Sequence, residues 1–305
     1  MLKCVVYIVT AYGYELLLKH REAMEKQLYG EGIKLQLCKS EEAGKITGKA
    51  TDKAAGKATC EEAEFFMEGH RDEKETLFLT DDVLTYKWLT EKKHPASVFY
   101  HEGNKGTYFE GAPYAFEDVE ELTGRSYEET YRRILGLPWD IFETEHLFVR
   151  ESTVADVPEF YRIYGEKSIT RYMDDLFQDP EEEKAYMEDY IRQFYGFYGF
   201  GMWTVVYKET GRVIGRAGLS LREGYEEPEL GFVIERAFQR KGLAYEVCRA
   251  ILQYAKEELL FDKVQAFVEP ENEASVNLLK KLDFHFVKEE KLKDKLYHLF
   301  LWQDA

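Results

Sequence analysis

Apolar residues recur with two different spacings along this chain, and each spacing predicts one type of element. In the first half, short apolar runs predict strands at 5–9, 33–38, 76–79, 97–100 and 112–116. The stretches 14–28 and 84–91, which lie between these runs, have helical spacing instead. This alternation of short strands and helices is typical of a small α/β layer domain.

The second half has longer, clearly bounded strands. Residues 202–207 and 212–220 predict a hairpin whose turn, 208–211, ends on Gly211, where a positive φ is favoured. Residues 229–234 and 264–268 predict two further strands, with a helix between them. Its buried stripe is expected at Ala244, Val247, Cys248, Ile251, Ala255 and Leu259, so the helix begins within two residues of Gly242.

The turn before this helix has the composition of an anion-binding site. The first amide N–H groups of a helix lack internal acceptors and carry the positive end of the dipole, which favours phosphate oxygens. Gly242 lets an anion approach the backbone without a Cβ, and Arg240 and Lys241 add positive charge. Both basic side chains are also compatible with simple exposure to water.

Two motifs in register resemble the GNAT acetyltransferase superfamily. Gln239, Gly242 and Ala244 fit its Gln/Arg-x-x-Gly-x-Gly/Ala signature, which binds the pyrophosphate of acetyl-CoA. Downstream, the segment that runs from Asn272 through Ser275 and Leu278 to Phe284 resembles the family's Asn-x-x-Ser/Ala-x-x-Leu segment. The resemblance covers about residues 146–302 and is closest to the branch that acetylates ribosomal-protein N-termini and aminoglycosides.

The resemblance implies a mixed, mostly antiparallel sheet with splayed central strands and flanking helices. It also implies acetyl-CoA as co-substrate, a primary amine as acceptor, which is a small molecule or a protein, and no metal. The cofactor-binding residues that it implies are Phe232, Val233, Ile234, Gln239, Arg240, Lys241, Gly242, Leu243, Ala244, Tyr245 and Asn272.

For catalysis, the resemblance points to Glu229 as the base and to Ser275 as a hydrogen-bond donor to the departing thiolate. Each has a structural alternative, because Glu229 is also an ordinary strand-end acid and Ser275 is also a helix cap. Many relatives have a tyrosine as the acid where this chain has Leu279. Arg236 and Asp283 are further departures from the family pattern, in place of a proline and a glycine.

The chain divides into two predicted domains, 1–145 and 146–305. Ser126 and Glu129 form a capping-box pattern for the last helix of the first domain, and a new strand is expected near Leu147. Within the first domain, residues 40–60 carry repeated Gly-Lys pairs and predict a mobile surface excursion. None of these pairs is followed directly by Ser or Thr, which excludes a Walker loop.

The first domain faintly resembles the Rossmann-like domains of haloacid-dehalogenase type, through residues 77–82. That family requires an Asp-x-Asp nucleophile pair, and no two aspartates in this chain are two positions apart. A phosphatase of this type is therefore disfavoured. Asp81 and Asp82 are interpreted as the N-cap of a helix and its neighbour.

Composition narrows the remaining choices. The 305 residues carry a net charge of −17, which argues against nucleic acid as a partner. The longest apolar runs are strand-sized, so no membrane span is expected. The four cysteines have no metal-type spacing and favour a reducing, cytoplasmic environment. Two function classes remain: an acetyl-CoA-dependent N-acetyltransferase that acts by direct transfer, and a non-catalytic acyl-CoA-binding regulator.

Overall fold

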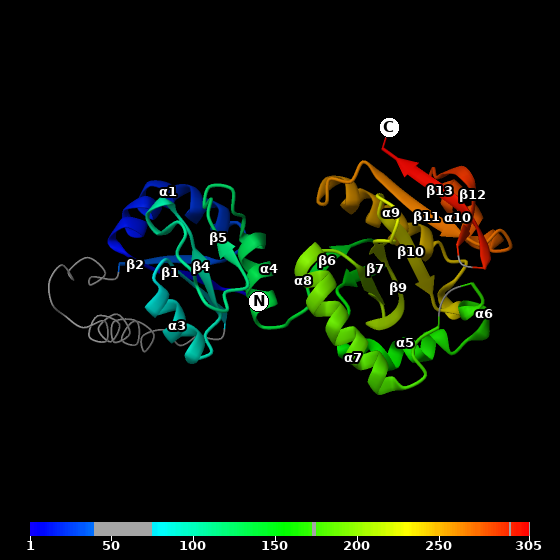
Figure 1. Cartoon of the computed structure of the whole chain (residues 1–305), viewed down its shortest axis with the longest axis horizontal. Coiled ribbons are helices and arrows are strands. Elements are labelled where there is room, and N and C mark those ends of the chain that lie inside the picture. Colours follow the sequence, from blue (N-terminus) through cyan, green and yellow to red (C-terminus); the bar gives the residue numbers. More distant parts are fainter. Residues whose placement is uncertain (40–74, 173–174, 293, 305) are drawn as a thin grey trace. The chain divides into compact units, whose positions relative to one another are not determined.

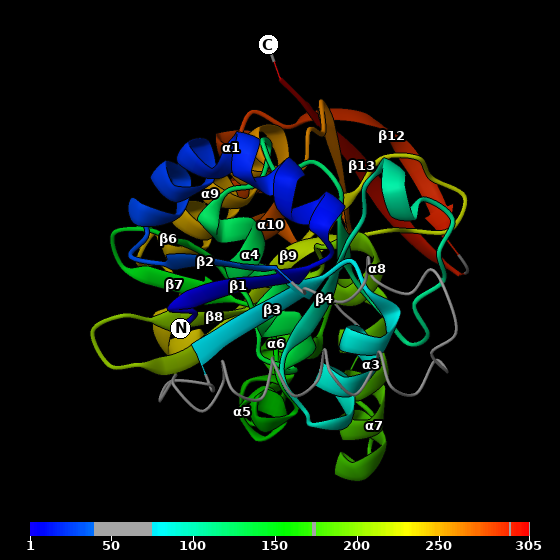
Figure 2. The ribbon, with the colours of Figure 1, turned by 90° about the vertical axis from the view of Figure 1, so that its left-hand side faces the viewer.

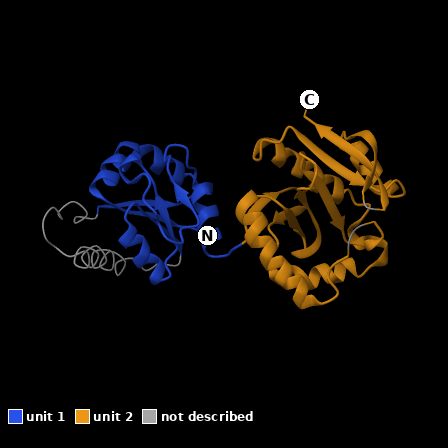
Figure 3. Ribbon diagram, in the orientation of Figure 1, with its two compact units in different colours: residues 1–137 blue, residues 138–305 orange. Residues whose placement is uncertain are grey.

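The computed structural model describes residues 1–39, 75–172, 175–292 and 294–304, which fall into two compact units. The units are Met1–Leu137 and Pro138–Ala305 (Figures 1 and 3). The predicted excursion at 40–60 lies outside the described residues.

The first unit is a parallel sheet whose strands alternate with helices. Its strands are β1 (Cys4–Val9), β2 (Lys34–Lys39), β3 (Thr76–Thr80), β4 (Ala96–Phe99) and β5 (Ala115–Phe116). Its α-helices are α1 (Ala11–Tyr29), α3 (Val83–Glu91) and α4 (Gly124–Ile134). The strands lie in the order β2-β1-β3-β4-β5, and every neighbouring pair is parallel. This is the α/β layer that the alternating pattern predicts.

Helices cover both faces of this sheet. On one face, Leu17 of α1 and Tyr127 of α4 share a buried cluster with Tyr7 of β1. On the other, Leu89 of α3 packs in a second cluster with Val98 of β4. Figure 2 shows α1 and α3 on opposite sides of the strands. Burial on both faces explains why the strands read as continuous apolar runs.

Helix caps in the first unit agree with the sequence at one position and differ at another. Asp82 caps α3, since its Oδ2 accepts from the Thr85 amide at 2.7 Å, so the cap is one member of the predicted pair Asp81 and Asp82. The cap of α4 is Thr123, whose side chain accepts from the Ser126 amide, so the prediction of Ser126 as the cap was wrong by one turn. Thr123 already supplies a hydroxyl, and the helix therefore begins earlier.

The second unit contains the strands β6 (Asp140–Glu143), β7 (Leu147–Arg150), β8 (Met202–Tyr207), β9 (Arg212–Ser220), β10 (Glu229–Ile234), β11 (Lys263–Val268), β12 (His285–Leu292) and β13 (Lys295–Gln303). Its helices are α5 (Val157–Tyr164), α6 (Lys167–Thr170), α7 (Pro180–Tyr190), α8 (Gly196–Tyr198), α9 (Leu243–Glu257) and α10 (Glu273–Lys281), with a π-helical segment at Ile191–Tyr195. The sequence placed β6 in the first domain, whereas it pairs with β7 in the second sheet.

The second sheet has eight strands, in the order β12-β13-β11-β10-β9-β8-β7-β6. Among the strand pairs that the structure describes in this sheet, only β10 and β11 are parallel, and their ladder consists of one pair, Glu229 with Gln265. Each strand pairs along its length with its other neighbour, β10 with β9 and β11 with β13. The sheet therefore parts between β10 and β11 beyond Glu229, which is the splayed arrangement that the sequence resemblance implies.

Side chains place helices on both faces of the second sheet. Trp203 of β8 packs edge-on against Tyr254 of α9, with ring centroids 5.5 Å apart. On the other face, the guanidinium of Arg216 in β9 lies 4.7 Å from the ring centroid of Phe160 in α5. Figures 1 and 2 both show α5 and α7 on the side of the sheet opposite α9.

Candidate functional site

The turn from β10 into α9 has an unusual backbone. Gly242 is the N-cap of α9 with φ of 85°, and Arg240 also has a positive φ, 61°. A Cβ on Gly242 would meet no atom within 4 Å, so glycine is required there by conformation and not by space. The turn is braced from inside by Gln239, whose Nε2 donates to the Ile234 carbonyl at 2.8 Å.

The start of α9 is open to a ligand. No side chain caps this helix, although its first three residues, Leu243, Ala244 and Tyr245, have amides without an acceptor inside the helix. Gly242 is exposed, as are Arg240 and Lys241. The Lys241 ammonium lies 4.9 Å from the ring centroid of Phe238. Free amides and flexible cations at one helix end favour an anion.

The acidic residue in the first turn of α9 is bound elsewhere. Glu246 accepts from the Thr144 hydroxyl at 2.6 Å, the His146 amide at 2.8 Å and the His146 imidazole at 2.9 Å. Partial burial raises the pKa of Glu246, but these hydrogen bonds from Thr144 and His146 outweigh burial and lower it. The carboxylate therefore ties α9 to the connection between β6 and β7.

The gap between β10 and β11 offers backbone groups and few polar side chains. Val233 and Ile234 are buried in the core, and Phe232 is half-buried against it. The vertex of the gap is held by Gln265, whose amide donates to the Pro228 carbonyl at 2.8 Å. Its Nε2 donates to the Glu227 carbonyl at 2.6 Å. Of the predicted cofactor residues, those on β10 can thus contribute mainly main-chain contacts.

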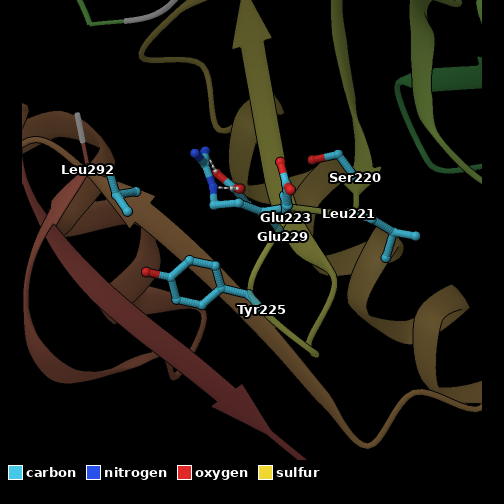
Figure 4. A pocket seen from close by; sticks show the side chains of 7 residues that line it. Ser220, Leu221, Glu223, Tyr225, Glu229 and Leu292 are labelled. Carbon is cyan, nitrogen blue, oxygen red and sulfur yellow. Dashed lines mark hydrogen bonds and ion pairs between the residues drawn. The ribbon is translucent and has the colours of Figure 1, made fainter.

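A cavity of about 460 Å³ lies at the vertex of this gap. It is lined by Ser220, Leu221, Arg222, Glu223, Tyr225, Glu229 and Leu292 (Figure 4). Arg222 donates to both oxygens of Glu229, from Nε at 2.5 Å and from a terminal nitrogen at 2.9 Å. This bidentate geometry is the strongest form of a carboxylate–guanidinium pair. Sequence reasoning identified Glu229 but missed Arg222, which no motif marks.

The predicted residues on α10 lie outside this lining. Asn272 is the N-cap of α10, and its Oδ1 accepts from the Ser275 amide at 3.3 Å. Ser275 is half-buried, and its hydroxyl has no hydrogen-bond partner among the residues that the structure describes. Leu279, which stands where many relatives have a tyrosine, is fully buried. Because Leu279 carries no hydroxyl, Ser275 is the hydroxyl-bearing residue that α10 offers in this motif.

The aromatic residues at 194–200 divide between core and surface. Tyr195 is buried, and its hydroxyl donates to the Met202 carbonyl at 2.5 Å. Phe200 is buried as well, whereas Phe197 is 80% exposed. Tyr198 is exposed too, so the cluster is divided between the core and the surface.

Comparison with known proteins identifies this unit. The family described as Acetyltransferase (GNAT) domain matches residues 146–285. Residues 146–285 are a GNAT domain. The match lies within the second unit, and the likeness of the first unit to haloacid-dehalogenase-type domains is not confirmed.

Similar proteins are found in bacilli. The uncharacterized protein YkkB of Bacillus subtilis is 32% identical over 93 residues, which are 30% of this chain and 54% of that protein, so the match spans about half of this relative. The uncharacterized N-acetyltransferase p20 of Bacillus licheniformis is 28% identical over 50% of this chain and 84% of its own length. A solved ribosomal-protein-S5-alanine acetyltransferase from Vibrio fischeri has a TM-score of 0.47 and 18% identity, over 53% of this chain and 95% of that one.

Metal-type clusters and membrane-spanning helices are both absent from the described residues. No group of three or more His, Cys, Asp and Glu side chains in them could hold a metal ion. No helix in the same parts of the chain is long and apolar enough to cross a membrane.

Proposed function

We propose that the chain moves the acetyl group of acetyl-CoA to a primary amine by direct transfer. The observation that carries this proposal is the uncapped start of α9, beside a sheet that parts at one residue pair. When bound, acetyl-CoA supplies a thioester whose carbonyl carbon can accept the electron pair of an amine. The acceptor is a protein N-terminus, a lysine or a small cationic amine.

The proposed cofactor contacts follow the geometry of the turn. The amides from Gly242 to Tyr245 would hold the pyrophosphate, with Arg240 and Lys241 supplying charge. Gln239 would act indirectly, because its side chain already bonds the Ile234 carbonyl and so fixes the turn. Asn272 would bond the pantetheine arm through its Nδ2, since its Oδ1 serves as a helix cap.

The two ends of the site are separated by the length of β10. The phosphate turn follows the Ile234 end of this strand, and the cavity lies at the Glu229 end. Six residues of strand span about 17 Å. The free edge of β10 would guide the arm of the cofactor over this distance, so that the thioester reaches the cavity in which the amine is received.

Direct transfer fits the nucleophiles that the GNAT domain contains. Cys248, its one described cysteine, is fully buried on α9, and burial raises the pKa of its thiol. Ser275 has no histidine base among its hydrogen-bond partners in the described structure. We assign the Ser275 hydroxyl to protonation of the leaving sulfur, and a carboxylate of the cavity to the proton of the amine.

The test of cofactor binding is Gly242→Glu, which places a bulky acid where the phosphates would bind. We expect calorimetric affinity for acetyl-CoA to be lost while the far-UV spectrum is retained, and the strain of a side chain at a positive φ should cost about 1–2 kcal/mol of stability in this variant. The matched control is Gly211→Glu, because Gly211 also has a positive φ, 67°, and open space around its Cβ, but lies in the β8–β9 turn. Equal affinity in both variants would refute the phosphate site.

Turnover separates the two function classes. The parental protein should release CoA thiol when it is supplied with amines from a panel of N-terminal peptides, lysine peptides, amino sugars and polyamines. A protein that binds acetyl-CoA tightly but acetylates no amine would support the alternative, a non-catalytic acyl-CoA-binding regulator. The buried Leu279 in place of a tyrosine is the observation that favours this alternative.

A further inference from the structure

The loop between β9 and β10 is a rigid part of the cavity. Residues Arg222 to Tyr225 form a tight turn, closed by the Tyr225 amide, which donates to the Arg222 carbonyl at 3.1 Å. Gly224 supplies the positive φ, 85°, that such a turn needs at its third position. Glu223 is therefore the second residue of a hydrogen-bonded turn.

One aromatic ring holds both ends of this turn. The guanidinium carbon of Arg222 lies 4.8 Å from the ring centroid of Phe267, on β11. The Tyr225 ring meets the same ring edge-on, with centroids 4.9 Å apart. Because Phe267 belongs to a strand, the backbone of Glu223 is fixed relative to the sheet.

The two carboxylates in the cavity differ in what they can still bind. Both oxygens of Glu229 accept from Arg222, and the pair is half-buried. Within the described residues, the Glu223 carboxylate has neither a hydrogen bond nor an ion pair, and the residue is exposed. Figure 4 shows Glu223 beside Glu229 in the lining of the cavity.

The charges of the lining favour one cation. Arg222 and Glu229 neutralise each other, and Glu223 leaves one uncompensated negative charge among the lining residues. The amine of an acceptor arrives mainly as an ammonium ion at neutral pH. A free carboxylate in a pocket attracts such an ion, whereas an arginine-bound carboxylate has little capacity left for it.

We propose that Glu223, and not Glu229, binds the ammonium of the acceptor and takes its proton. The inference rests on the proposed acetyl transfer. An N–H bond of the ammonium breaks and an O–H bond forms on Glu223, directly or through one water. The freed electron pair of the nitrogen forms the N–C bond, and the nitrogen releases its second proton to water as the C–S bond breaks. The sulfur receives a proton from Ser275, which regains one from water. Glu223, being exposed, returns its proton to solvent.

In this scheme Arg222 and Glu229 are positioning residues. Their pair is anchored on Phe267 and forms one wall of the cavity beside Glu223. Loss of Glu229 would free the guanidinium and add a positive charge next to the incoming ammonium. Its removal should therefore raise KM for the amine, while kcat at saturating amine changes little.

The test compares three neutralising substitutions with one conservative variant. Glu223→Gln should lower kcat/KM for the amine about 10²-fold, the scale of a lost general base. Glu226→Gln is the matched control, since Glu226 lies in the same loop outside the cavity lining, and it should stay within about twofold of the parental value. Glu229→Gln should act mainly on KM. Glu223→Asp should restore part of the rate that Glu223→Gln loses.

Binding measurements keep this inference distinct from the proposed function. With CoA-saturated protein, n-butylamine should bind more tightly than n-butanol, and Glu223→Gln should abolish the difference even if no amine is acetylated. Acetyl-CoA affinity should be the same in all four variants. Parental rates and amine preference in Glu223→Gln, or a larger loss of kcat in Glu229→Gln, would overturn the assignment.

Discussion

Helices α1 and α9 each follow a strand of a parallel pair, yet their N-termini differ. The hydroxyl of Thr10 caps α1 by accepting from the Gly13 amide at 3.3 Å. A Cβ on Gly13 would lie 2.3 Å from Oδ2 of Asp81, so this helix start is packed against a carboxylate. Gly242, at the start of α9, has no side chain and open space around it.

The polar side chains of the first unit and of the GNAT domain differ in the same way. Asp81 accepts from the Thr10 amide at 2.7 Å, from the Thr10 hydroxyl at 2.6 Å and from His101 at 2.9 Å. The other ring nitrogen of His101 accepts from the Gly103 amide, so Nε2 carries the proton that is donated to Asp81. In the GNAT domain, by contrast, the Ser275 hydroxyl and the Glu223 carboxylate make no hydrogen bond within the described residues. Polar residues at strand ends thus indicate a binding site only where their hydrogen bonds are not already made.

The largest effect should come from removing β6, which tests whether the two units fold independently. We expect residues 138–305 to unfold cooperatively and to bind acetyl-CoA within a few-fold of the full chain. Residues 146–305 should lose about 5 kcal/mol of unfolding free energy, because buried Ile141 and the pairing with β7 are gone. The buried Glu151 also loses the Trp139 amide as a donor.

Urea unfolding of both fragments, with and without acetyl-CoA, measures this difference. Each fragment is the control for the other, since they differ only in residues 138–145. An insoluble 138–305 fragment would show that the units share one core. Equal stability of the two fragments would show that β6 contributes nothing.

The second effect concerns the polar cluster of Asp81, Thr10 and His101 in the first unit, in which Asp81 is hydrogen-bonded to both other residues. Asp81→Ala should lower the unfolding free energy of that unit by about 3 kcal/mol, because buried donors of Thr10 and His101 lose their acceptor. The neighbouring variant Asp82→Ala removes only a helix cap and should cost about 1 kcal/mol.

The measurement is urea unfolding of the full chain with saturating acetyl-CoA, which stabilises only the unit that binds it. The transition that the ligand leaves unshifted reports the first unit. Acetyl-CoA affinity should be unaffected in both variants. If Asp81→Ala lowers the unfolding free energy no more than Asp82→Ala does, the hydrogen bonds that Asp81 accepts do not stabilise the first unit to the expected extent.

The smallest effect tests whether a polar cluster is structural because its hydrogen bonds are already made, and not because of the unit in which it lies. Asp156 in the GNAT domain is closed, since both oxygens accept from Arg150 at 2.7 Å and one also accepts from the Thr153 amide at 2.8 Å. Burial raises the pKa of Asp156, but the hydrogen bonds from Arg150 and Thr153 prevail and lower it.

A lowered folded-state pKa contributes stability above the unfolded value, 3.8, which is lost as the pH falls through the folded value. As the pH falls below about 5, the unfolding free energy of the GNAT domain should therefore decrease more in the parental protein than in Asp156→Asn. The readout is the difference between their unfolding free energies across this range. Parallel pH profiles in the two proteins would contradict it.

The sequence predicted local secondary structure better than it predicted which polar side chains are already hydrogen-bonded. The hairpin at 202–220, the strand at 229–234 and the glycine before α9 follow from periodicity and turn residues, because those signals lie within a few positions. The β6 strand was missed because its pairing partner β7, and not its own four residues, defines it.

The site shows the same limit. The family resemblance pointed to Glu229 at the start of a strand, but whether its oxygens are free depends on Arg222, seven positions earlier. The closed state of Asp81 depends on His101 and Thr10, which lie 20 and 71 positions away. No local pattern records such pairings. The identity of a titratable residue was therefore predictable, but whether its hydrogen bonds were already made was not.

The single residue pair that joins β10 to β11 has a consequence for hydrogen exchange. Amides along the facing edges of these strands lack a cross-strand acceptor beyond Glu229 and Gln265. They should exchange with deuterium rapidly although they lie in the middle of an eight-stranded sheet. The centre of this sheet, usually the slowest region of a domain to exchange, would then become protected only when a ligand supplies the missing acceptors.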